Sequence, residues 1–224
     1  MEAEQALDGN KFSEVVDIYP VTGRKLFLGR ASDAEAIAQL AAGGARIVQL
    51  REKGLCDLEF YRLAVLYREE TRKHGMMLII NDRVDIALAC GADGVHLGLG
   101  DMPIPEARSI LGPDAVIGGS SHTVEQAMEA EAQGASYVNI GPLFATATKP
   151  GVPGIGLEPL CLVMERVKIP VTCMGGITER NICQVVLAGA RYVGVVGAIF
   201  GARDMAGVTA RFASVIRGAG KIMK

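Results

Sequence analysis

The sequence lacks the charge excess and the long apolar runs that mark several classes of protein. It carries 23 Lys and Arg against 25 Asp and Glu, which gives a net charge of −2, so no global electrostatic field attracts nucleic acid or a membrane surface. No stretch approaches the roughly 18 apolar residues of a membrane span, and residues 1–10 are acidic without the apolar core of a signal peptide. We therefore expect a soluble cytoplasmic protein with neither a nucleic-acid nor a membrane partner.

Cysteine and histidine are also too sparsely arranged for several kinds of site. The five cysteines show no CxxC spacing and mostly fall within apolar segments, which favours reduced thiols in the cytoplasm. No His/Cys metal-ligand spacing and no paired nucleophile and base is recognisable. Chemistry at a zinc ion or through a protein nucleophile is therefore disfavoured.

Eight short apolar runs are present, each followed by a segment with helical spacing that is rich in Ala, Leu, Glu and Arg. The runs comprise residues 17–21, 47–50, 77–80, 94–97, 115–118, 137–140, 171–174 and 192–196. Eight such units predict a single α/β domain, a (β/α)8 TIM barrel, over residues 15–224, with residues 1–14 as a loosely held extension. A doubly wound open sheet uses the same units, but no GxGxxG follows the first run, so this fold ranks second.

Glycine, in contrast, is abundant, with 28 residues in the chain against an average near 7%. Four related sequences, AAGGAR, ACGADG, AQGAS and LAGAR, precede the second, fourth, sixth and eighth runs. In each we predict a helix that ends on a glycine in the left-handed conformation, after which the chain enters the next strand within a few residues.

Acidic residues follow the third and fourth runs, at Asp82 and Asp101, and one helix-length segment separates the two runs. If the two strands are parallel neighbours, their carboxyl ends lie about 5 Å apart, so both carboxylates can reach one cation. Carboxylate oxygens together with substrate phosphates suit Mg²⁺. The alternative is that both residues only cap the helices that follow, Asp101 with the help of Pro103.

Two basic residues, Arg51 and Lys53, follow the second run. On an emerging strand they alternate, so both can point into the mouth of the barrel toward a phosphate or a diphosphate. The alternative is a pair of solvated charges at a strand end. Lys149 and the glycines that follow other strands would lie at the same end of the barrel. They favour the interpretation that Arg51 and Lys53 bind an anion.

Further phosphate-binding groups follow the last three runs. The loop after the sixth run is longer than the usual two to six residues, and its Thr146, Thr148 and Lys149 offer two hydroxyls and one cation. Residues 175–176 and 196–197 follow the seventh and eighth runs, where barrels often bind phosphate through main-chain N–H groups. Two anion sites beside a cation site predict a transfer between two phosphorylated small molecules.

The polar cluster after the fifth run, Ser120 to His122, has two interpretations. His122 can act as a general acid or base, although no acidic partner is apparent in the sequence, and a polar helix start fits equally well. His96 is better explained as a structural residue, and His74 as a residue near a helix end.

These motifs resemble those of the thiamine phosphate synthases, a (β/α)8 family. The matching segments are QLREK at 49–53, IND at 80–82, GADGVHLG at 91–98 with Asp101 beyond it, SSH at 120–122, NIGPLFATATKP at 139–150 and GGI at 175–177. They occur in the family order from about residue 19 to the C-terminus, so the resemblance rests on the whole set and not on one motif.

The resemblance implies that 4-amino-5-hydroxymethyl-2-methylpyrimidine diphosphate is joined to 4-methyl-5-(2-hydroxyethyl)thiazole phosphate, which gives thiamine phosphate and pyrophosphate. In this family the pyrimidine C–O bond is thought to break first, and the pattern assigns the Mg²⁺ cofactor to Asp82 and Asp101. The pyrimidine diphosphate would be held by Gln49, Arg51, Lys53, Asn81, Ser120 and Lys149, of which Arg51, Lys53, Ser120 and Lys149 would also assist catalysis. The thiazole phosphate would be surrounded by Thr146, Ala147, Thr148, Gly176, Val196 and Gly197.

Three positions depart from the family pattern, which commonly has glutamine at Leu99, serine at Gly197 and aspartate at Gly23. Two other functions stay open. A thiazole tautomerase of the same fold would move a proton with an imidazole such as that of His122, and a catalytically silent barrel would bind phosphates of the thiamine pathway as a sensor. The retained carboxylates and cations favour the synthase, whose partners are small-molecule phosphates. The sequence leaves a homo-oligomer open.

Overall fold

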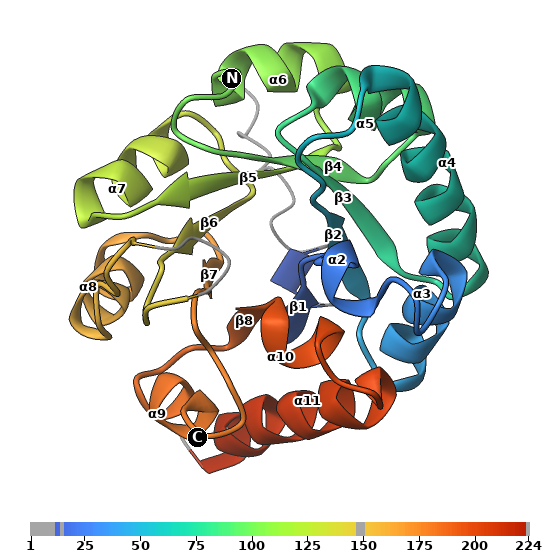
Figure 1. The fold of residues 1–224 in the computed structure, drawn as a ribbon. Coiled ribbons are helices and arrows are strands. Elements are labelled where there is room, and N and C mark those ends of the chain that lie inside the picture. The colour runs from blue at the N-terminus through green and yellow to red at the C-terminus, as the bar shows by residue number, and fades with distance from the viewer. Residues whose placement is uncertain (1–11, 14–15, 147–150, 223–224) are drawn as a thin grey trace.

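Eight strands form one parallel sheet that closes into a barrel, and the helices surround it (Figure 1). The computed structural model describes residues 12–13, 16–146 and 151–222, with side chains up to residue 218. The predicted (β/α)8 fold is therefore confirmed, and the open doubly wound sheet is excluded.

Strands and helices alternate along the chain. The strands are β1 (Ile18–Pro20), β2 (Ile47–Leu50), β3 (Met77–Asn81), β4 (Gly94–Leu97), β5 (Val116–Ser121), β6 (Tyr137–Ile140), β7 (Val171–Cys173) and β8 (Tyr192–Val195). The helices are α2 (Arg24–Phe27), α3 (Asp33–Ala42), α4 (Asp57–Lys73), α5 (Val84–Cys90), α6 (Ile104–Leu111), α7 (Val124–Ala132), α8 (Glu158–Arg166), α9 (Ile182–Leu187), α10 (Gly197–Phe200) and α11 (Met205–Ile222). The short helices α2 and α10 are additions to the regular alternation.

Two hydrogen-bonded contacts at the ends of the strand order close the barrel. The strand order is β1-β8-β7-β6-β5-β4-β3-β2, so β1 and β2 are its two ends. Val21 forms a parallel bridge with Gln49, and the N–H of Thr22 donates to the carbonyl of Gln49 at 2.9 Å. The segment after β1 is thereby fixed beside the end of β2, so the two ends of the strand order meet.

Most strand boundaries agree with the predicted runs to within one residue, and β5 is the exception. It extends to Ser121, so Ser120 and Ser121 lie on the strand. The prediction that both residues follow the strand is therefore wrong. The reason is pairing with β6, in which Ser120 is opposite Asn139 and Ser121 is opposite Ile140. Two glycines inside the strand and a polar end had masked this continuation in the sequence pattern.

The four glycines predicted to end helices do adopt the left-handed conformation. The φ angles are 88° at Gly44, 64° at Gly91, 87° at Gly134 and 101° at Gly189. A residue with a Cβ is strained in this region of φ, whereas glycine is not. These positions let the chain reverse from each helix into the next strand over a short connection.

Apolar side chains pack in two separate regions. The larger region lies between the outer face of the strands and the helices. The smaller region fills the inside of the barrel and consists of Phe12, Val16, Tyr19, Ile47, Ile79, Val116 and Tyr137. The ring of Phe12 is fully buried and stacks on that of Tyr137, with centroids 4.1 Å apart. Phe12 therefore belongs to the packed core, although it lies in the stretch that was expected to be a loose extension.

Glycine at position 118 makes room for a large side chain inside the barrel. A Cβ added to Gly118 would lie 2.1 Å from the Cζ atom of Tyr137. That distance is far below a van der Waals contact, so the tyrosine ring occupies the space that a side chain at 118 would need.

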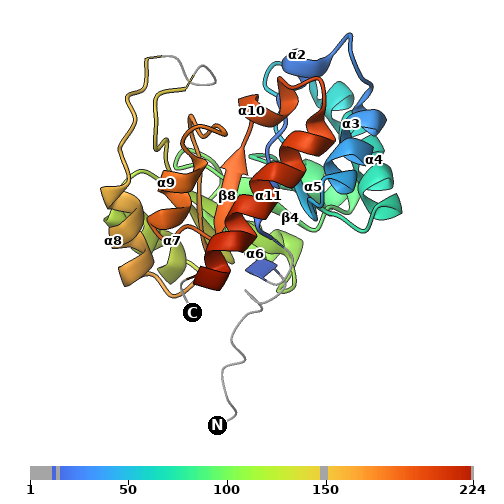
Figure 2. The same cartoon turned by 90° about the horizontal axis from the view of Figure 1, so that it is seen from below.

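The short helices α2 and α10 lie at the same end of the barrel when it is viewed from the side (Figure 2). Each follows the carboxyl end of a strand, so this end is the mouth, where (β/α)8 enzymes place their active sites. None of the helices in the described part of the chain is long and apolar enough to cross a membrane.

Candidate active site

The segment after β2 carries the first set of charged residues at the mouth. The sequence pattern predicted that Arg51 and Lys53 lie on an emerging strand, but β2 ends at Leu50. The reason is Thr22, whose hydroxyl accepts from the N–H of Arg51 at 2.8 Å and approaches the carbonyl of Arg51 at 3.1 Å. The hydroxyl replaces the strand ladder and fixes this turn of the chain. Sequence reasoning missed Thr22, because a lone threonine after β1 carries no recognisable signal.

Asp82 is held in an unusual backbone conformation at the end of β3. Its φ is 65°, which makes it the one residue other than glycine with a positive φ among residues 12–13, 16–146 and 151–222. Its N–H donates to the carbonyl of His96 at 2.9 Å, which ties the turn to β4. Strained backbone of this kind costs about 1–3 kcal/mol and occurs most often at functional sites.

The carboxylate of Asp82 lies beside one cation and one other carboxylate. The Nζ atom of Lys53 is 3.7 Å from Oδ2 of Asp82. Burial raises the pKa of Asp82, the neighbouring carboxyl of Asp101 raises it further, and Lys53 and Arg51 oppose that rise. The four charged groups therefore interact within one small region of the mouth.

Asp101 is oriented by the turn that follows β4. Its Oδ2 accepts the N–H of Gly98 at 2.6 Å. Neither aspartate caps a helix, because the N-cap residues of α5 and α6 are Arg83 and Pro103. The alternative interpretation of these carboxylates as helix caps is therefore wrong.

The paired carboxylates have the oxygen-rich chemistry that suits a hard divalent cation. Two like charges this close are unfavourable unless a proton or a cation lies between them. Within the described residues, no group of three or more His, Cys, Asp or Glu side chains forms a metal site. An ion at Asp82 and Asp101 would thus take its other ligands from water or from a substrate phosphate, which is the usual manner of Mg²⁺ binding.

A chain of buried polar side chains crosses the inside of the barrel just below the mouth. Nε2 of Gln49 donates to the hydroxyl of Tyr19 at 2.9 Å, and the hydroxyls of Tyr19 and Tyr137 are 2.8 Å apart. Nδ1 of His96 is 2.9 Å from the hydroxyl of Tyr137, and its Nε2 is 2.9 Å from Oγ of Ser120. Gln49 and Ser120, which the sequence assigned to one substrate, are thereby linked through three residues that it did not assign.

Sequence reasoning missed Tyr19 and Tyr137 because it examined the residues that follow each strand and not those within the strands. A signal was present. Side chains two residues apart face the same side of a strand, so Tyr137 shares the face of Asn139, and both are buried. His96 was interpreted as structural, and its two ring nitrogens are in fact bonded inside the barrel.

His122 contacts the backbone at the start of the loop after β6. Its Nδ1 is hydrogen-bonded to the carbonyl of Gly141, and its own N–H donates to the side chain of Gln126 at 2.8 Å. The helix-start interpretation of this residue fits these contacts, since Gln126 lies in the first turn of α7. No acidic side chain is bonded to the ring in the part of the chain that the structure describes.

The base of the loop after β6 is bound to the segment after β7. The N–H groups of Leu143 and Phe144 donate to the carbonyls of Met174 and Gly175, at 2.9 and 3.0 Å. A Cβ on Gly176 would lie 2.5 Å from the carbonyl oxygen of Ala145, so this close approach requires glycine. Gly176 thus lies directly beside the start of the loop.

The loop after β6 begins and ends against the barrel. Thr146 is half-buried on the near side. Ala147, Thr148 and Lys149, which the sequence also assigned to substrate binding, lie outside the described residues. The GVPGIG segment returns to the barrel, where the N–H of Ile155 donates to the carbonyl of Pro142 at 2.9 Å.

Val196 and Gly197 form the start of α10 at the mouth. Val196 is the N-cap residue, and Gly197 is exposed, with no atom within 4 Å of the position that a Cβ would take. The guanidinium of Arg30 donates to the carbonyls of Phe200 and Ala202, at 3.0 and 3.1 Å. These bonds fix the far end of α10, so its first N–H groups keep their direction at the mouth.

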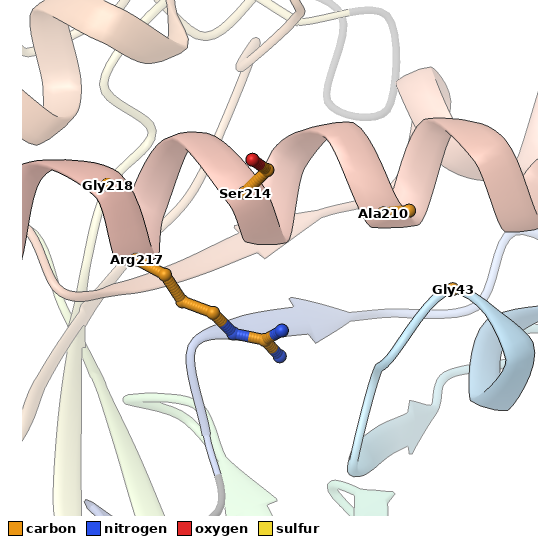
Figure 3. Close-up of a pocket in the computed structure, with 5 residues that line it drawn as sticks. All are labelled: Gly43, Ala210, Ser214, Arg217 and Gly218. Carbon is orange, nitrogen blue, oxygen red and sulfur yellow. The ribbon is translucent and has the colours of Figure 1, made fainter.

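A cavity of about 310 Å³ lies elsewhere, on the outside of the barrel between the end of α3 and α11 (Figure 3). Its lining consists of Gly43, Ala210, Ser214, Arg217 and Gly218. The guanidinium of Arg217 is engaged by the carboxylate of Asp17, which precedes β1. The cavity is therefore at the amino-terminal end of the strands, away from the charged residues of the mouth, and it is not a candidate for the active site.

Comparison with known proteins connects this arrangement to one family. Residues 18–199 match the family model described as thiamine monophosphate synthase. A thiamine-phosphate synthase of Moorella thermoacetica is 44% identical over 202 residues, which cover 89% of this chain and 95% of that protein. One from Caldanaerobacter subterraneus subsp. tengcongensis is 43% identical over 184 residues, covering 82% of this chain and 86% of the relative.

A solved structure has the same architecture. Thiamine phosphate pyrophosphorylase from Pyrococcus furiosus superposes with a TM-score of 0.84 at 35% sequence identity, over 93% of this chain and 98% of the other. A 3-hexulose-6-phosphate synthase superposes with a TM-score of 0.64 at 20% identity, which shows a shared fold and no more.

Proposed function

The chain belongs to the thiamine monophosphate synthase family, and from this membership we propose how its mouth residues carry out the reaction. It is a transferase that joins the hydroxymethylpyrimidine diphosphate to the thiazole phosphate, so that thiamine phosphate forms and pyrophosphate leaves. The pyrimidine carbon loses its bond to the diphosphate oxygen, and the thiazole nitrogen forms the new bond to that carbon. The catalytic task of the protein is therefore to stabilise a departing diphosphate, which carries several negative charges, and to align the thiazole nitrogen.

We propose that Asp82 and Asp101 hold Mg²⁺. The support is the contact between the two carboxyls, which adds to the rise that burial causes in the pKa of Asp82, and the hydrogen bond that orients Asp101. When bound, Mg²⁺ would neutralise negative charge on the diphosphate as the C–O bond breaks. The nearby ammonium of Lys53, 3.7 Å from Asp82, would remain available to a diphosphate oxygen on the same side.

The diphosphate and the pyrimidine ring would be held by residues of β2, β3 and β5. We assign Arg51, Lys53 and the loop residue Lys149 to the diphosphate oxygens, because cations there stabilise the charge that develops on the leaving group. Gln49 and Asn81, both buried inside the rim of the mouth, would bind the polar edge of the pyrimidine. Ser120, bonded to His96 at 2.9 Å, would present its hydroxyl to the same substrate.

The thiazole phosphate would lie between the loop after β6 and the start of α10. We assign Thr146, Ala147, Thr148, Gly176, Val196 and Gly197 to this substrate. Main-chain N–H groups of Gly176 and of Gly197 would bind phosphate oxygens, as barrels commonly do after the seventh and eighth strands. The loop would also exclude water from the pyrimidine cation, which otherwise would be hydrolysed.

The observation that carries the proposal most directly is the grouping of Asp82, Asp101, Lys53 and Arg51 at one place. The test mixes both phosphorylated substrates with Mg²⁺ and follows pyrophosphate. Release should require both substrates, should stop when the metal is chelated, and should be lost in Asp82→Ala. Release that survives chelation or this substitution would refute the metal site.

The same assay separates the other two functions. A thiazole tautomerase would convert its thiazole substrate without Mg²⁺ and without the pyrimidine, and would depend on His122. A catalytically silent sensor would bind the phosphates and turn nothing over. The arrangement of paired carboxylates beside cations favours the synthase, because neither alternative needs to stabilise a departing diphosphate.

Three broader properties remain proposals from the sequence. We expect a cytoplasmic location, one barrel domain over residues 15–224, and a role without nucleic-acid or membrane partners. A homo-oligomer is compatible with these expectations. Size-exclusion chromatography with light scattering would measure the oligomeric state.

A further inference from the structure

We propose that Tyr19, Tyr137 and His96 form a polarised hydrogen-bond relay that positions Gln49 and Ser120 for the pyrimidine substrate. The relay runs in one direction, from the amide of Gln49 to the hydroxyl of Ser120, and it crosses the inside of the barrel. Tyr137 is the central positioning residue, because it joins the two halves. This inference rests on the proposed roles of Gln49 and Ser120 in substrate binding, and it adds residues and a histidine tautomer that those roles do not require.

The direction follows from counting hydrogens. The amide nitrogen of Gln49 can only donate, so the hydroxyl of Tyr19 accepts from it at 2.9 Å. Tyr19 then has its own hydrogen to give, and the hydroxyl of Tyr137 lies 2.8 Å away. Tyr137 in turn has one hydrogen for Nδ1 of His96, at 2.9 Å. In this arrangement each tyrosine hydroxyl accepts once and donates once.

The direction fixes the state of His96. If Nδ1 accepts from Tyr137, the neutral ring carries its hydrogen on Nε2. Nε2 then donates to Oγ of Ser120 at 2.9 Å. The hydroxyl of Ser120 accepts this bond and turns its own hydrogen toward the mouth of the barrel. Ser120 is thereby set as a donor to the substrate and not as an acceptor.

The reverse direction would be less favourable. If Ser120 donated to His96, then Nδ1 would carry the hydrogen and Tyr137 would have to donate back to Tyr19. The hydroxyl of Tyr19 would accept two hydrogen bonds, and its own hydrogen would be left over in a site where the side chain is fully buried. Burying an unsatisfied donor costs free energy.

Two further features keep the relay neutral and rigid. Burial is the largest cause that raises the pKa of Tyr19 and of Tyr137 well above the ordinary value, so both hydroxyls keep their hydrogens at any working pH. The ring of Tyr137 stacks on Phe12 with centroids 4.1 Å apart, and it fills the space that Gly118 leaves. The hydroxyl of Tyr137 therefore has a single position from which it reaches both Tyr19 and His96.

The first test reads the histidine tautomer directly in the protein without substrate. Nitrogen-15 NMR of histidine-labelled protein reports which ring nitrogen carries hydrogen, and the chain has three histidines. Removing the signals of the two exposed ones with His74→Gln and His122→Gln assigns that of His96. We expect hydrogen on Nε2 and none on Nδ1, and we expect this preference to be lost in Tyr137→Phe. Hydrogen on Nδ1 in the unsubstituted protein would overturn the proposed direction.

The second test asks whether Tyr137 acts through Ser120. Tyr137→Phe keeps the ring and its packing, and we expect about a tenfold loss of kcat/KM for the pyrimidine diphosphate, the size of one hydrogen bond, with KM for the thiazole phosphate unchanged. In a Ser120→Ala background the same substitution should cause much less additional loss, because the two residues belong to one relay. Tyr192→Phe is the matched control, since Tyr192 packs on Phe12 in the same interior region and is not part of the relay.

The outcomes separate this inference from the proposed function. If Ser120→Ala impairs turnover but Tyr137→Phe has no effect, or has its full effect in both backgrounds, the relay is refuted while the proposed site stands. If Ser120→Ala leaves turnover unchanged, the proposed role of Ser120 itself fails. Tyr19→Phe offers a second route to the same answer from the Gln49 side, should Tyr137→Phe fold poorly.

Discussion

The carboxyl group of Asp82 lies against that of Asp101, across the ends of two neighbouring strands of the barrel. Each is brought there by its own backbone, Asp82 by a left-handed φ of 65° and Asp101 by a hydrogen bond from Gly98 at 2.6 Å. Such a pair stores electrostatic repulsion that a divalent cation would relieve. The melting temperature of a variant that lacks one of the two charges would measure that repulsion.

Asp101→Asn should raise the melting temperature in the absence of divalent cations, because it removes one of two like charges while keeping an oxygen for the N–H of Gly98. The same substitution should abolish the additional stabilisation that Mg²⁺ with pyrophosphate gives the unsubstituted protein. Thermal unfolding with and without these ligands measures both effects. Asp57→Asn is the control, since the side chain of Asp57 is 82% exposed in a surface ion pair and should matter little. An unchanged response to Mg²⁺ in Asp101→Asn would contradict the metal assignment.

Gly197→Ser should strengthen binding of the thiazole phosphate. A Cβ at this position meets no atom within 4 Å, so the side chain fits without strain, and it adds the hydroxyl that the family commonly carries there. A gain of about 1 kcal/mol from one hydrogen bond would lower KM for the thiazole phosphate several-fold and leave KM for the pyrimidine diphosphate unchanged. Steady-state kinetics with each substrate varied in turn would check this. Equal changes in both constants would argue against a phosphate contact at 197.

Gly118→Ala should destabilise the barrel from within. The added Cβ would lie 2.1 Å from the ring of Tyr137, and relief of such overpacking typically costs about 1–3 kcal/mol. Urea unfolding measures the free energy of unfolding. Gly218→Ala is the matched control, because its Cβ meets nothing within 4 Å on α11, and alanine in a helix is about 1 kcal/mol better than glycine. The two substitutions should therefore change stability in opposite directions.

Glu52→Gln should change how stability depends on pH. Burial is the largest cause that raises the pKa of Glu52, and hydrogen bonds from the N–H of Arg24 and from Thr22 offset it only in part. A carboxyl with a raised pKa in the folded state binds more protons folded than unfolded, so stability falls as pH rises from the ordinary value to the raised one. Above the raised pKa the carboxylate of Glu52 is fully ionised, and its burial then lowers the free energy of unfolding by the full amount. The free energy of unfolding, measured from pH 4 to pH 7, should decline less with rising pH in Glu52→Gln, and identical pH profiles would contradict the prediction.

Lys149→Ala should lower turnover by more than about tenfold, since it removes one cation from the departing diphosphate. The prediction rests on the sequence, because Lys149 lies outside the described residues. Single-turnover measurement of pyrophosphate release would detect a loss in the chemical step. Lys168→Ala, at an exposed position after α8, is a control for the loss of one positive charge. Near-normal release in Lys149→Ala would remove this lysine from the mechanism.

Much of the fold was predictable because it depends on short-range patterns. Apolar runs of four or five residues separated by helical segments predict strands and helices, and glycines such as Gly91 and Gly189 mark where each helix must end. Eight such units then have few ways to bury their strands on both faces, and closure into a barrel is the common one. The boundary of β5 was the main error, since its last residues are polar and belong to the strand only through their pairing with β6.

The candidate site was predictable in part, for a related reason. Residues that follow parallel strands lie at one end of the sheet, so the proximity of Asp82 and Asp101 was predictable from the sequence. What could not be predicted is how each loop bends after the strand. Arg51 leaves the strand because of Thr22, from a distant part of the chain, and Phe12 joins the core through contact with Tyr137.

The sequence by itself determined the number and order of strands, the end of the barrel at which charge collects, and the family to which the chain belongs. These follow from residue type and spacing, which act locally. Only the tertiary structure decided that Gln49 and Ser120 are linked through two tyrosines and a histidine. That link depends on which side chains of five different strands point inward and meet, and the register between strands is fixed by pairing across the whole closed sheet.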